Sequence, residues 1–257
     1  MNGFCLLLLS SLLVIQPDDG AKKNRRPKNR VERKAFQDSY AEITYHDRWE
    51  KVVTVRFFDP ENHRISEEHF SNYPLRIRHG RASAWYPNGQ LRWACDFKNN
   101  QINGPYFSYF EDGTLKRREL YRQGVARKGE CFTPDGTPTA CNPLVQQAEF
   151  DGNQKQFIQF MKERLPRIPS TEPTLFITLK GTLSEEGILF GLRPMPYMAQ
   201  RPQSEKDLAR QLIESLHDMP RWRPLIIDDQ PIQSDLLISI QFSNGKVFNA
   251  SYGINLL

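Results

Sequence analysis

Turn-forming residues and aromatic residues recur with a period of about 24 residues through the first half of the chain. The turns fall at residues 60–63, 87–90, 111–114 and 134–137. Aromatic residues stand four positions before the third residue of each turn and, in the first three units, eight positions after it: Phe58, Trp85, Tyr109 and Phe132, then Phe70, Phe97 and Tyr121. Asn-Gly and Asp-Gly turns between aromatic runs favour β-hairpins, because both central residues tolerate positive φ.

A single hairpin cannot bury its own apolar face, so the repeats predict an elongated antiparallel array of stacked hairpins with a continuous aromatic stripe. Gly104 and Gly129, near the starts of units, permit close passage between neighbouring strands. Two interpretations of the stripe remain open. It forms the core of the array, or it forms a surface on which a ligand or peptide stacks.

The pattern changes after Pro143 to one of alternating helices and strands. Asn153 can cap an amphipathic helix that runs to about Leu165, and residues 174–183 alternate like a strand that turns back into residues 188–192. A capping-box-like start at residues 204–207 leads into a second helix, and residues 236–242 alternate along a last strand. The whole chain is therefore expected to be α+β, with the hairpin array followed by a small α-β-β-α-β domain.

Residues 219–224 (MPRWRP) join the second predicted helix to the last strand. Prolines two residues on either side of Trp222 restrict the backbone to an extended conformation and hold the indole in one place. Two roles for Trp222 are open: an anchor that packs the crossover onto the sheet, or a side chain of a binding site.

The N-terminus begins with an apolar run over residues 4–15. As a helix it would span roughly 18 Å, less than the about 30 Å of a bilayer's hydrocarbon core, so it indicates the apolar region of a signal peptide. No Lys or Arg precedes the run and no small-x-small cleavage site follows it. A misassigned start codon and an inner-membrane anchor are the alternatives.

Charge is concentrated in one short segment of this 257-residue chain. Residues 22–34 hold eight Lys and Arg against one Glu, whereas the rest of the chain has 27 cations and 29 anions, so the net charge of +5 does not describe its body. The segment is typical of a solvated linker, with a phosphate- or lipid-binding arm as the alternative. The expected organisation is an apolar N-terminus over 1–21, a basic linker over 22–40, hairpin repeats over 41–143 and the α+β domain over 144–257.

Cys131 and Cys141 lie five residues before and five residues after Gly136 in the last turn. Positions of this kind can face each other across a hairpin, so either a disulfide or two free thiols would fit. Cys95, inside the aromatic repeat, is expected to be a small core residue.

Catalytic motifs are absent from the sequence. The five histidines have no metal-ligand spacing, and the chain has no C-x-x-C pair, no G-x-S-x-G elbow and no phosphate-binding loop. We therefore expect a protein that is not an enzyme, with no catalytic residues, no cofactor and no metal. An envelope hydrolase whose site assembles from distant residues is a weaker alternative.

Two family resemblances follow from these motifs. The segments GRASAWYPNGQLR and GPYFSYFEDGTLKR resemble the bacterial MORN-repeat variant, over about residues 50–140. That family is a repeat scaffold of envelope and antitoxin-type proteins, which implies binding rather than catalysis. Asn62 takes the Gly place in the first unit, and the last unit lacks the aromatic ending, as in atypical capping repeats.

Residues 146–243 are similar to the C-terminal domain of TonB-type energy transducers. The resemblance rests on the order of helices and strands and on a set of signature residues: Phe150, Gly152, Met219, Pro220, Trp222 and Pro224. Asp151 replaces the family's Pro, and Leu225 stands where Gly is usual. The resemblance implies a periplasmic domain that adds a partner's extended segment to an edge strand. The candidate edge is the last strand: Leu236, Leu237, Ile238, Ser239, Ile240, Gln241 and Phe242.

The leading hypothesis is an exported, non-catalytic envelope scaffold that binds a protein partner, such as an outer-membrane transporter, by strand addition. No nucleic acid is expected as a partner, and membrane association would come through the N-terminus. The alternative is a cytoplasmic antitoxin-like or regulatory binder whose basic arm contacts nucleic acid or anionic lipid.

Overall fold

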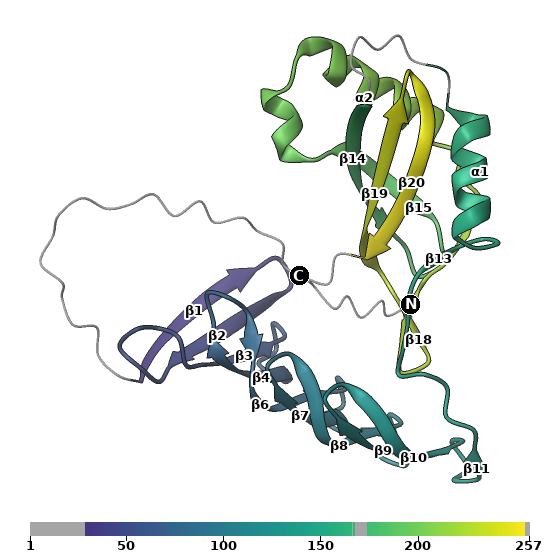
Figure 1. The fold of residues 1–257 in the computed structure, drawn as a ribbon. Helices are drawn as coiled ribbons and strands as arrows, with labels where there is room; N and C mark the ends of the chain where they lie inside the picture. Colours follow the sequence, from purple (N-terminus) through teal and green to yellow (C-terminus); the bar gives the residue numbers. More distant parts are fainter. Residues whose placement is uncertain (1–28, 166, 168–173, 255–257) are drawn as a thin grey trace, which may run out of the picture. The chain divides into compact units, whose positions relative to one another are not determined.

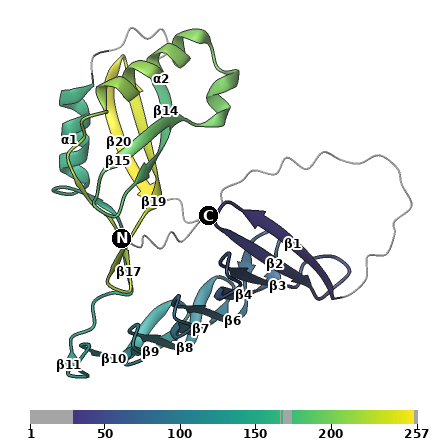
Figure 2. The same ribbon diagram turned by 180° about the vertical axis from the view of Figure 1, so that it is seen from behind.

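The structure is a computed structural model that describes residues 29–165, 167 and 174–254. The chain divides between Cys141 and Asn142 into two compact units, two residues before the boundary expected from the sequence. We call the described residues up to Cys141 the hairpin unit and those from Asn142 the C-terminal unit (Figures 1 and 2).

The hairpin unit is one antiparallel sheet of 11 strands in which neighbours in sequence are, with few exceptions, neighbours in space. Its strands are β1 (Arg30–Phe36), β2 (Ser39–Tyr45), β3 (Val53–Phe58), β4 (Arg64–Asn72), β5 (Ile77–Arg78), β6 (Gly80–Trp85), β7 (Leu91–Lys98), β8 (Gln101–Tyr109), β9 (Leu115–Arg122), β10 (Val125–Phe132) and β11 (Pro138–Thr139). The order is β1-β2-β3-β4-β6-β7-β8-β9-β10-β11, with β5 paired to β4. The predicted hairpin array is therefore present.

Two kinds of turn alternate along the array. At the predicted turns, the N–H groups of Gly89, Gly113 and Gly136 donate to the carbonyl three residues earlier, at 2.8–2.9 Å. At the opposite end of the strands, Asn99–Asn100 and Gln123–Gly124 have positive φ at both positions, which is the requirement of a two-residue type I′ turn. Each strand therefore connects one kind of turn to the other, and its aromatic residues keep fixed positions relative to both turns.

The aromatic residues that follow the turns supply the buried face of this sheet. Phe70 and Tyr121 are buried, as is Tyr106, whereas Phe58 and Trp85 are half-buried. The core interpretation of the stripe therefore holds for Phe70 and Tyr121, whereas Phe97, the third aromatic residue after a turn, is half-buried. The aromatic residues before each turn are partly open to solvent.

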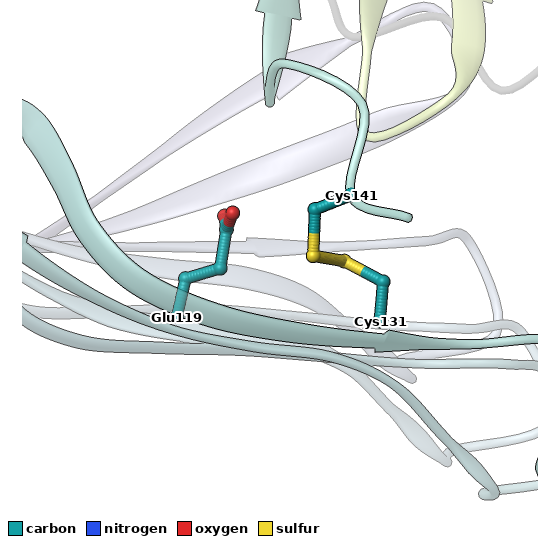
Figure 3. A group of neighbouring side chains, drawn as sticks. All are labelled: Glu119, Cys131 and Cys141. Atoms are coloured by element: carbon teal, nitrogen blue, oxygen red, sulfur yellow. A yellow bond between two sulfur atoms is a disulfide. The ribbon is translucent and has the colours of Figure 1, made fainter. Parts of the chain in front are cut away.

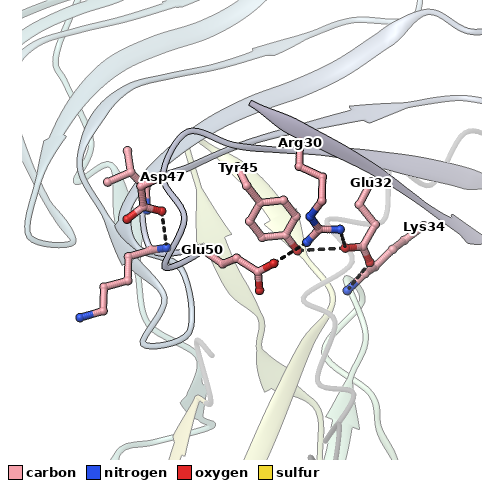
Figure 4. A network of polar contacts seen from close by, with 8 residues as sticks. Arg30, Glu32, Lys34, Tyr45, Asp47 and Glu50 are labelled. Atoms are coloured by element: carbon pink, nitrogen blue, oxygen red, sulfur yellow. Dashed lines mark hydrogen bonds and ion pairs between the residues drawn. The ribbon is translucent and has the colours of Figure 1, made fainter. Parts of the chain in front are cut away.

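The basic linker expected over residues 22–40 is wrong from residue 30 onwards, because β1 and the start of β2 occupy that range. The side chains of Arg30, Glu32 and Lys34 alternate on one face of β1 and are half-buried (Figure 4). Arg30 contacts Glu50 at 2.6 Å and Glu32 at 3.1 Å, and its guanidinium lies 4.2 Å from the centre of the Tyr45 ring. Carboxylates and a tyrosine ring compensate the cations, and backbone pairing to β2 then orders the strand.

Ionisation within this network follows from its burial. Burial raises the pKa of the Tyr45 hydroxyl to about 12, and the Glu32 carboxylate that accepts its hydrogen bond adds to the effect. Burial opposes ionisation of Glu32, but Lys34 and Arg30 lower the pKa of that carboxyl overall. The network is thus held with Tyr45 protonated and Glu32 charged.

The C-terminal unit combines a four-stranded sheet, two small sheets and two α-helices. Its elements are β12 (Val145–Gln146), β13 (Glu149–Phe150), α1 (Gln154–Arg164), β14 (Thr174–Leu183), β15 (Leu189–Pro194), the 3₁₀ helix η1 (Pro196–Gln200), α2 (Gln203–Ser215), β16 (Trp222–Arg223), β17 (Leu225–Ile227), β18 (Gln230–Ile232), β19 (Ser234–Ser243) and β20 (Lys246–Ile254). The four-stranded sheet has the order β15-β14-β19-β20, β12 pairs with β17 and β17 with β18, and β13 pairs with β16. In the two views α2 lies across one face of the four-stranded sheet, and α1 packs beside β20 (Figures 1 and 2).

Trp222 lies at the centre of an aromatic cluster in this unit. Its ring centre is 5.2 Å from that of Phe150, 5.7 Å from Phe157 and 4.8 Å from Tyr252, and the side chain is 3% exposed. The carbonyl of Trp222 is so close to Gly187 that a Cβ there would lie 1.9 Å from it. Trp222 is therefore an anchor of the crossover rather than an exposed binding residue.

The other signature residues lie in the turn before α1 and in the chain segments on either side of Trp222. Gly152 has φ of +97° in the turn before α1, and Asn153 caps the helix by accepting from two backbone N–H groups, as expected. Met219 packs at the margin of the core, Pro224 is half-buried, and Pro220 is exposed.

The expected fold class, an α+β chain ending in a TonB-like domain, is wrong. The described residues are 54% strand and 13% helix, and the protein is mostly β. The sequence interpretation missed strands that follow two type I′ turns, at Asp228–Asp229 and Asn244–Gly245, where all four φ values lie between +48° and +73°. The second of these turns creates β20, a full fourth strand of the sheet.

The expected capping box at residues 204–207 is also wrong. The helix α2 starts one residue earlier, after Pro202, and no side chain caps it. Pro202 is the N-cap residue, with φ of −53° and ψ of 152°, and its carbonyl accepts from the backbone N–H groups of Glu205 and Lys206.

Residues 1–21 lie outside the described residues, so the signal peptide or anchor stays a prediction. In the ranges that the structure describes, no helix is both long enough and apolar enough to cross a bilayer.

Candidate functional site

The sequence placed a partner-binding edge at residues 236–242, and this expectation is wrong. These residues belong to β19, which is hydrogen-bonded to β14 on one side and to β20 on the other. Leu236, Ile238, Ile240 and Phe242 point into the core and are at most 1% exposed. A strand with both neighbours in place has no free N–H or C=O groups to offer a partner.

The neighbouring strand β20 is the true edge on this side, but its centre is closed. The side-chain amide of Gln154 donates to the Ala250 carbonyl at 2.6 Å, and the Asn249 side chain accepts from the Ala250 N–H at 2.9 Å. A partner strand would have to displace both groups. Side chains that cover an edge in this way protect it from pairing with other chains.

The hairpin unit ends in a more open edge at β10. Its residues 125–130 are all exposed, and they pair with β9 on one side, whereas β11 joins the other side only at Cys131 and Phe132. A further hairpin of the repeat would continue the sheet at this position. The backbone groups of β10 are therefore the natural place for strand addition.

The surface around this edge is basic. Arg122, Arg127 and Lys128 are exposed and form no ion pair with any residue that the structure describes, whereas Arg118 pairs with Glu130. Leu120 and Val125, each 52% exposed, add apolar surface beside them. The combination suits an extended acidic segment with some apolar side chains.

A disulfide between Cys131 and Cys141 closes the end of the array (Figure 3). Beside it lies Glu119, whose carboxylate accepts from Tyr121 at 2.7 Å and contacts Arg117 at 3.2 Å. Both Arg117 and Glu119 are buried, and a Cβ at Gly129 would lie 2.7 Å from the Glu119 Cγ. Because Gly129 has no side chain, it leaves room for this buried pair.

Among residues 29–165, 167 and 174–254, one set of three residues brings potential metal-ligand atoms together: Glu119, Cys131 and Cys141. The Glu119 carboxylate and the two cysteine sulfurs lie within 4.8 Å of one another. A disulfide sulfur is not a thiolate, so this form has no thiolate ligands. Cys95, in contrast, is a buried free thiol whose pKa is raised to about 12 by burial, as expected of a core cysteine.

Three of the five histidines line one pocket in the hairpin unit, although sequence spacing gave no reason to group them. The pocket has a volume of about 400 Å³. Its lining residues are His46, Val52, Val53, Thr54, Arg56, His69, Phe70, Ser71 and His79. His46 and His69 are 23 residues apart, close to one repeat period, and this was the signal available in the sequence.

Residues 78–99 and 102–123 match the family model of the MORN repeat variant. These two segments contain β6–β7 and β8–β9, so each matched repeat is one hairpin of the array. The match confirms the MORN resemblance for this part of the chain and does not extend to residues 146–243. No curated protein and no solved structure matches the chain.

Proposed function

We propose that this protein is a non-catalytic scaffold of an oxidising cell-envelope compartment, and that it binds an extended acidic segment of a protein partner along β10. The MORN-variant hairpins indicate a repeat-based binding or scaffold protein. The single observation that carries the proposal further is the exposed, basic edge of β10 at the end of that array.

The choice of β10 rests on a comparison of the strands. β19 is internal, and β20 is closed at Ala250 by Gln154 and Asn249. β10 has six consecutive exposed residues, and its Arg127 and Lys128 form no ion pair within the part of the chain that the structure describes. Lys and Arg on an edge discourage pairing with another copy of the same basic strand, but they favour an acidic strand.

The proposed compartment is supported by the disulfide between Cys131 and Cys141, because disulfides persist in exported proteins and are rare in the cytosol. The apolar run over residues 4–15 is the corresponding export signal. A link to outer-membrane transport is not included, because the TonB-like fold on which it depended is wrong.

Site-specific photo-crosslinking in cells tests the binding surface. A photoreactive residue at Val125 should capture a partner through an acidic extended segment, identified by mass spectrometry of the crosslinked peptide. A photoreactive residue at Leu75, 68% exposed in the same unit, is the matched control and should not capture it.

Charge reversal then tests the recognition. Arg127→Glu with Lys128→Glu should abolish the crosslink at Val125, and reversing the acidic residues of the captured segment should restore it. Lys51→Glu, at an exposed position away from β10, should have no effect. The proposal fails if capture at Val125 survives Arg127→Glu with Lys128→Glu, or if nuclease treatment removes the captured material.

Fractionation tests the compartment independently. The protein should be recovered with envelope fractions, with residues 131 and 141 resistant to alkylation until a reductant is added. Recovery in the cytosol with both thiols free and an intact N-terminus would refute the proposed location and leave the β10 interface to be judged by crosslinking.

A further inference from the structure

The histidine-lined pocket lies at the other end of the hairpin unit from β10, in the first strands of the array. Three segments of chain contribute to it: His46 follows β2, His69 lies on β4, and His79 precedes β6. The pocket is thus separate in sequence and in sheet position from the proposed partner edge.

Backbone pairing holds the three histidine residues close together in the sheet. His69 stands opposite Thr54 in the register of β3 and β4, and the Thr54 hydroxyl lies 2.7 Å from Nε2 of His46. The N–H of His79 donates to the carbonyl of His69 at 2.9 Å. The sheet therefore preorganises the pocket before any ligand enters.

The charged groups around the pocket centre on Glu67, a carboxylate that is shared by Arg56 and Arg64. Arg56 is the one permanent cation in the lining, and its Nε donates to Glu67 at 2.7 Å. The other Glu67 oxygen lies 3.4 Å from Nε2 of His69. Since Glu67 also contacts Arg64 at 3.5 Å, each imidazole that gains a proton adds a positive charge that this one carboxylate does not balance.

The surroundings of His69 disfavour its protonated form. Burial lowers the pKa of its imidazole, His46 and Arg56 act in the same direction, and Glu67 opposes them. A bound anion would reverse this balance and raise the imidazole pKa, because an opposite charge nearby favours the charged form. Anion binding and proton uptake must therefore be coupled.

The remaining walls of the pocket are apolar and favour a ligand that carries an apolar group. Val52, Val53 and Phe70 line the pocket beside the polar groups. We propose that the pocket binds a carboxylate attached to an apolar group, and that it binds this ligand more tightly as the pH falls. Two sources share this chemistry: a small aromatic or aliphatic acid, and the C-terminal residue of a peptide.

Calorimetric titration of the full chain with phenylacetate, at pH 5.5 and pH 7.5, tests the proposal. We expect binding about tenfold tighter at pH 5.5, the change that one pKa unit on one imidazole gives, with proton uptake seen as a dependence of the heat on the buffer. Phenylacetamide, which keeps the ring and lacks the charge, should bind at least tenfold more weakly than phenylacetate at pH 5.5. A dipeptide ending in Phe, with a free or an amidated C-terminus, separates the peptide source from the small acid.

Variants assign the effect to the pocket. His69→Gln and, separately, His46→Gln should remove most of the pH dependence. His63→Gln is the control, because His63 is exposed and contacts Asp59 in a turn outside the pocket. Equal binding of phenylacetate and phenylacetamide, an affinity that does not change with pH, or a His63→Gln effect equal to that of His69→Gln would each overturn the proposal. So would binding of Zn²⁺ by the full chain together with no detectable binding of phenylacetate or of the dipeptide with a free C-terminus.

Discussion

The disulfide between Cys131 and Cys141 gives the sharpest quantitative prediction for the stability of the hairpin unit. It joins two residues 10 positions apart, and it ties the end of β10 to the segment after β11. In the chain-entropy description, closing a loop of about ten residues removes roughly 9 cal/mol/K from the unfolded ensemble, or about 2.7 kcal/mol at 25 °C. Reduction should lower the free energy of unfolding of this unit by about that amount.

The effect on melting follows from the size of the unit. The unfolding entropy of a unit of about 110 residues is near 0.23 kcal/mol/K, so the loss corresponds to a Tm decrease of about 12 °C. Differential scanning calorimetry should show one transition that falls on adding a reductant and a second that does not. Hydrogen exchange should increase first in β9 and β10, because the disulfide closes that end of the array.

The matched variant carries Cys131→Ala with Cys141→Ala. Its hairpin-unit transition should fall close to that of the reduced protein, and a reductant should not change it further. The reasoning is refuted if the variant melts with the oxidised protein, or if a reductant lowers the variant's Tm as much as it lowers that of the native chain.

Three further predictions concern single sites. Trp222→Ala should lower the free energy of unfolding of the C-terminal unit by about 3–5 kcal/mol in urea titrations, whereas Trp49→Ala, at a position 65% exposed, should cost little; equal losses would contradict the anchor role. Glu119→Leu should lower the free energy of unfolding by about 3–5 kcal/mol, because it removes the carboxylate that contacts the buried Arg117. Arg117→Leu combined with Glu119→Leu should lower it by less than Glu119→Leu alone, and a larger loss in the double variant would count against the buried pair. The Tyr45 hydroxyl should titrate near pH 12 in ultraviolet difference spectra. Because its native pKa exceeds the unfolded value of about 10, its contribution to stability should be complete below pH 10 and lost as the pH rises through about 12. Tyr45→Phe should remove this titration step.

The repeat and its turns could be predicted from the sequence because their chemistry is local. Positive φ at Gly89 and Gly113, and the aromatic residues at fixed distances from them, specify each hairpin within about twelve residues. The same rule would have found the Asn244–Gly245 turn and therefore β20. That omission made β19 look like an edge strand.

The strand β1 shows a different limit. Its composition is that of a solvated basic segment, and its order comes from Glu50 and Tyr45, which lie outside it. The composition of this segment shows that burying the charges of Arg30 and Lys34 is unfavourable. The groups that compensate these charges become visible only once the strands are paired.

From the sequence alone we could predict the hairpin repeat, the Asn153 cap of α1, and a change of architecture after Pro143. Turn geometry and side-chain alternation act over a few neighbouring residues, so they can be read along the chain. Only the paired structure shows that β19 is internal, that residues 125–130 of β10 have a partner strand on one side alone, and that His46, His69 and His79 line one pocket. These outcomes depend on which strands hydrogen-bond to each other, and that pairing is set by contacts between residues far apart in the sequence.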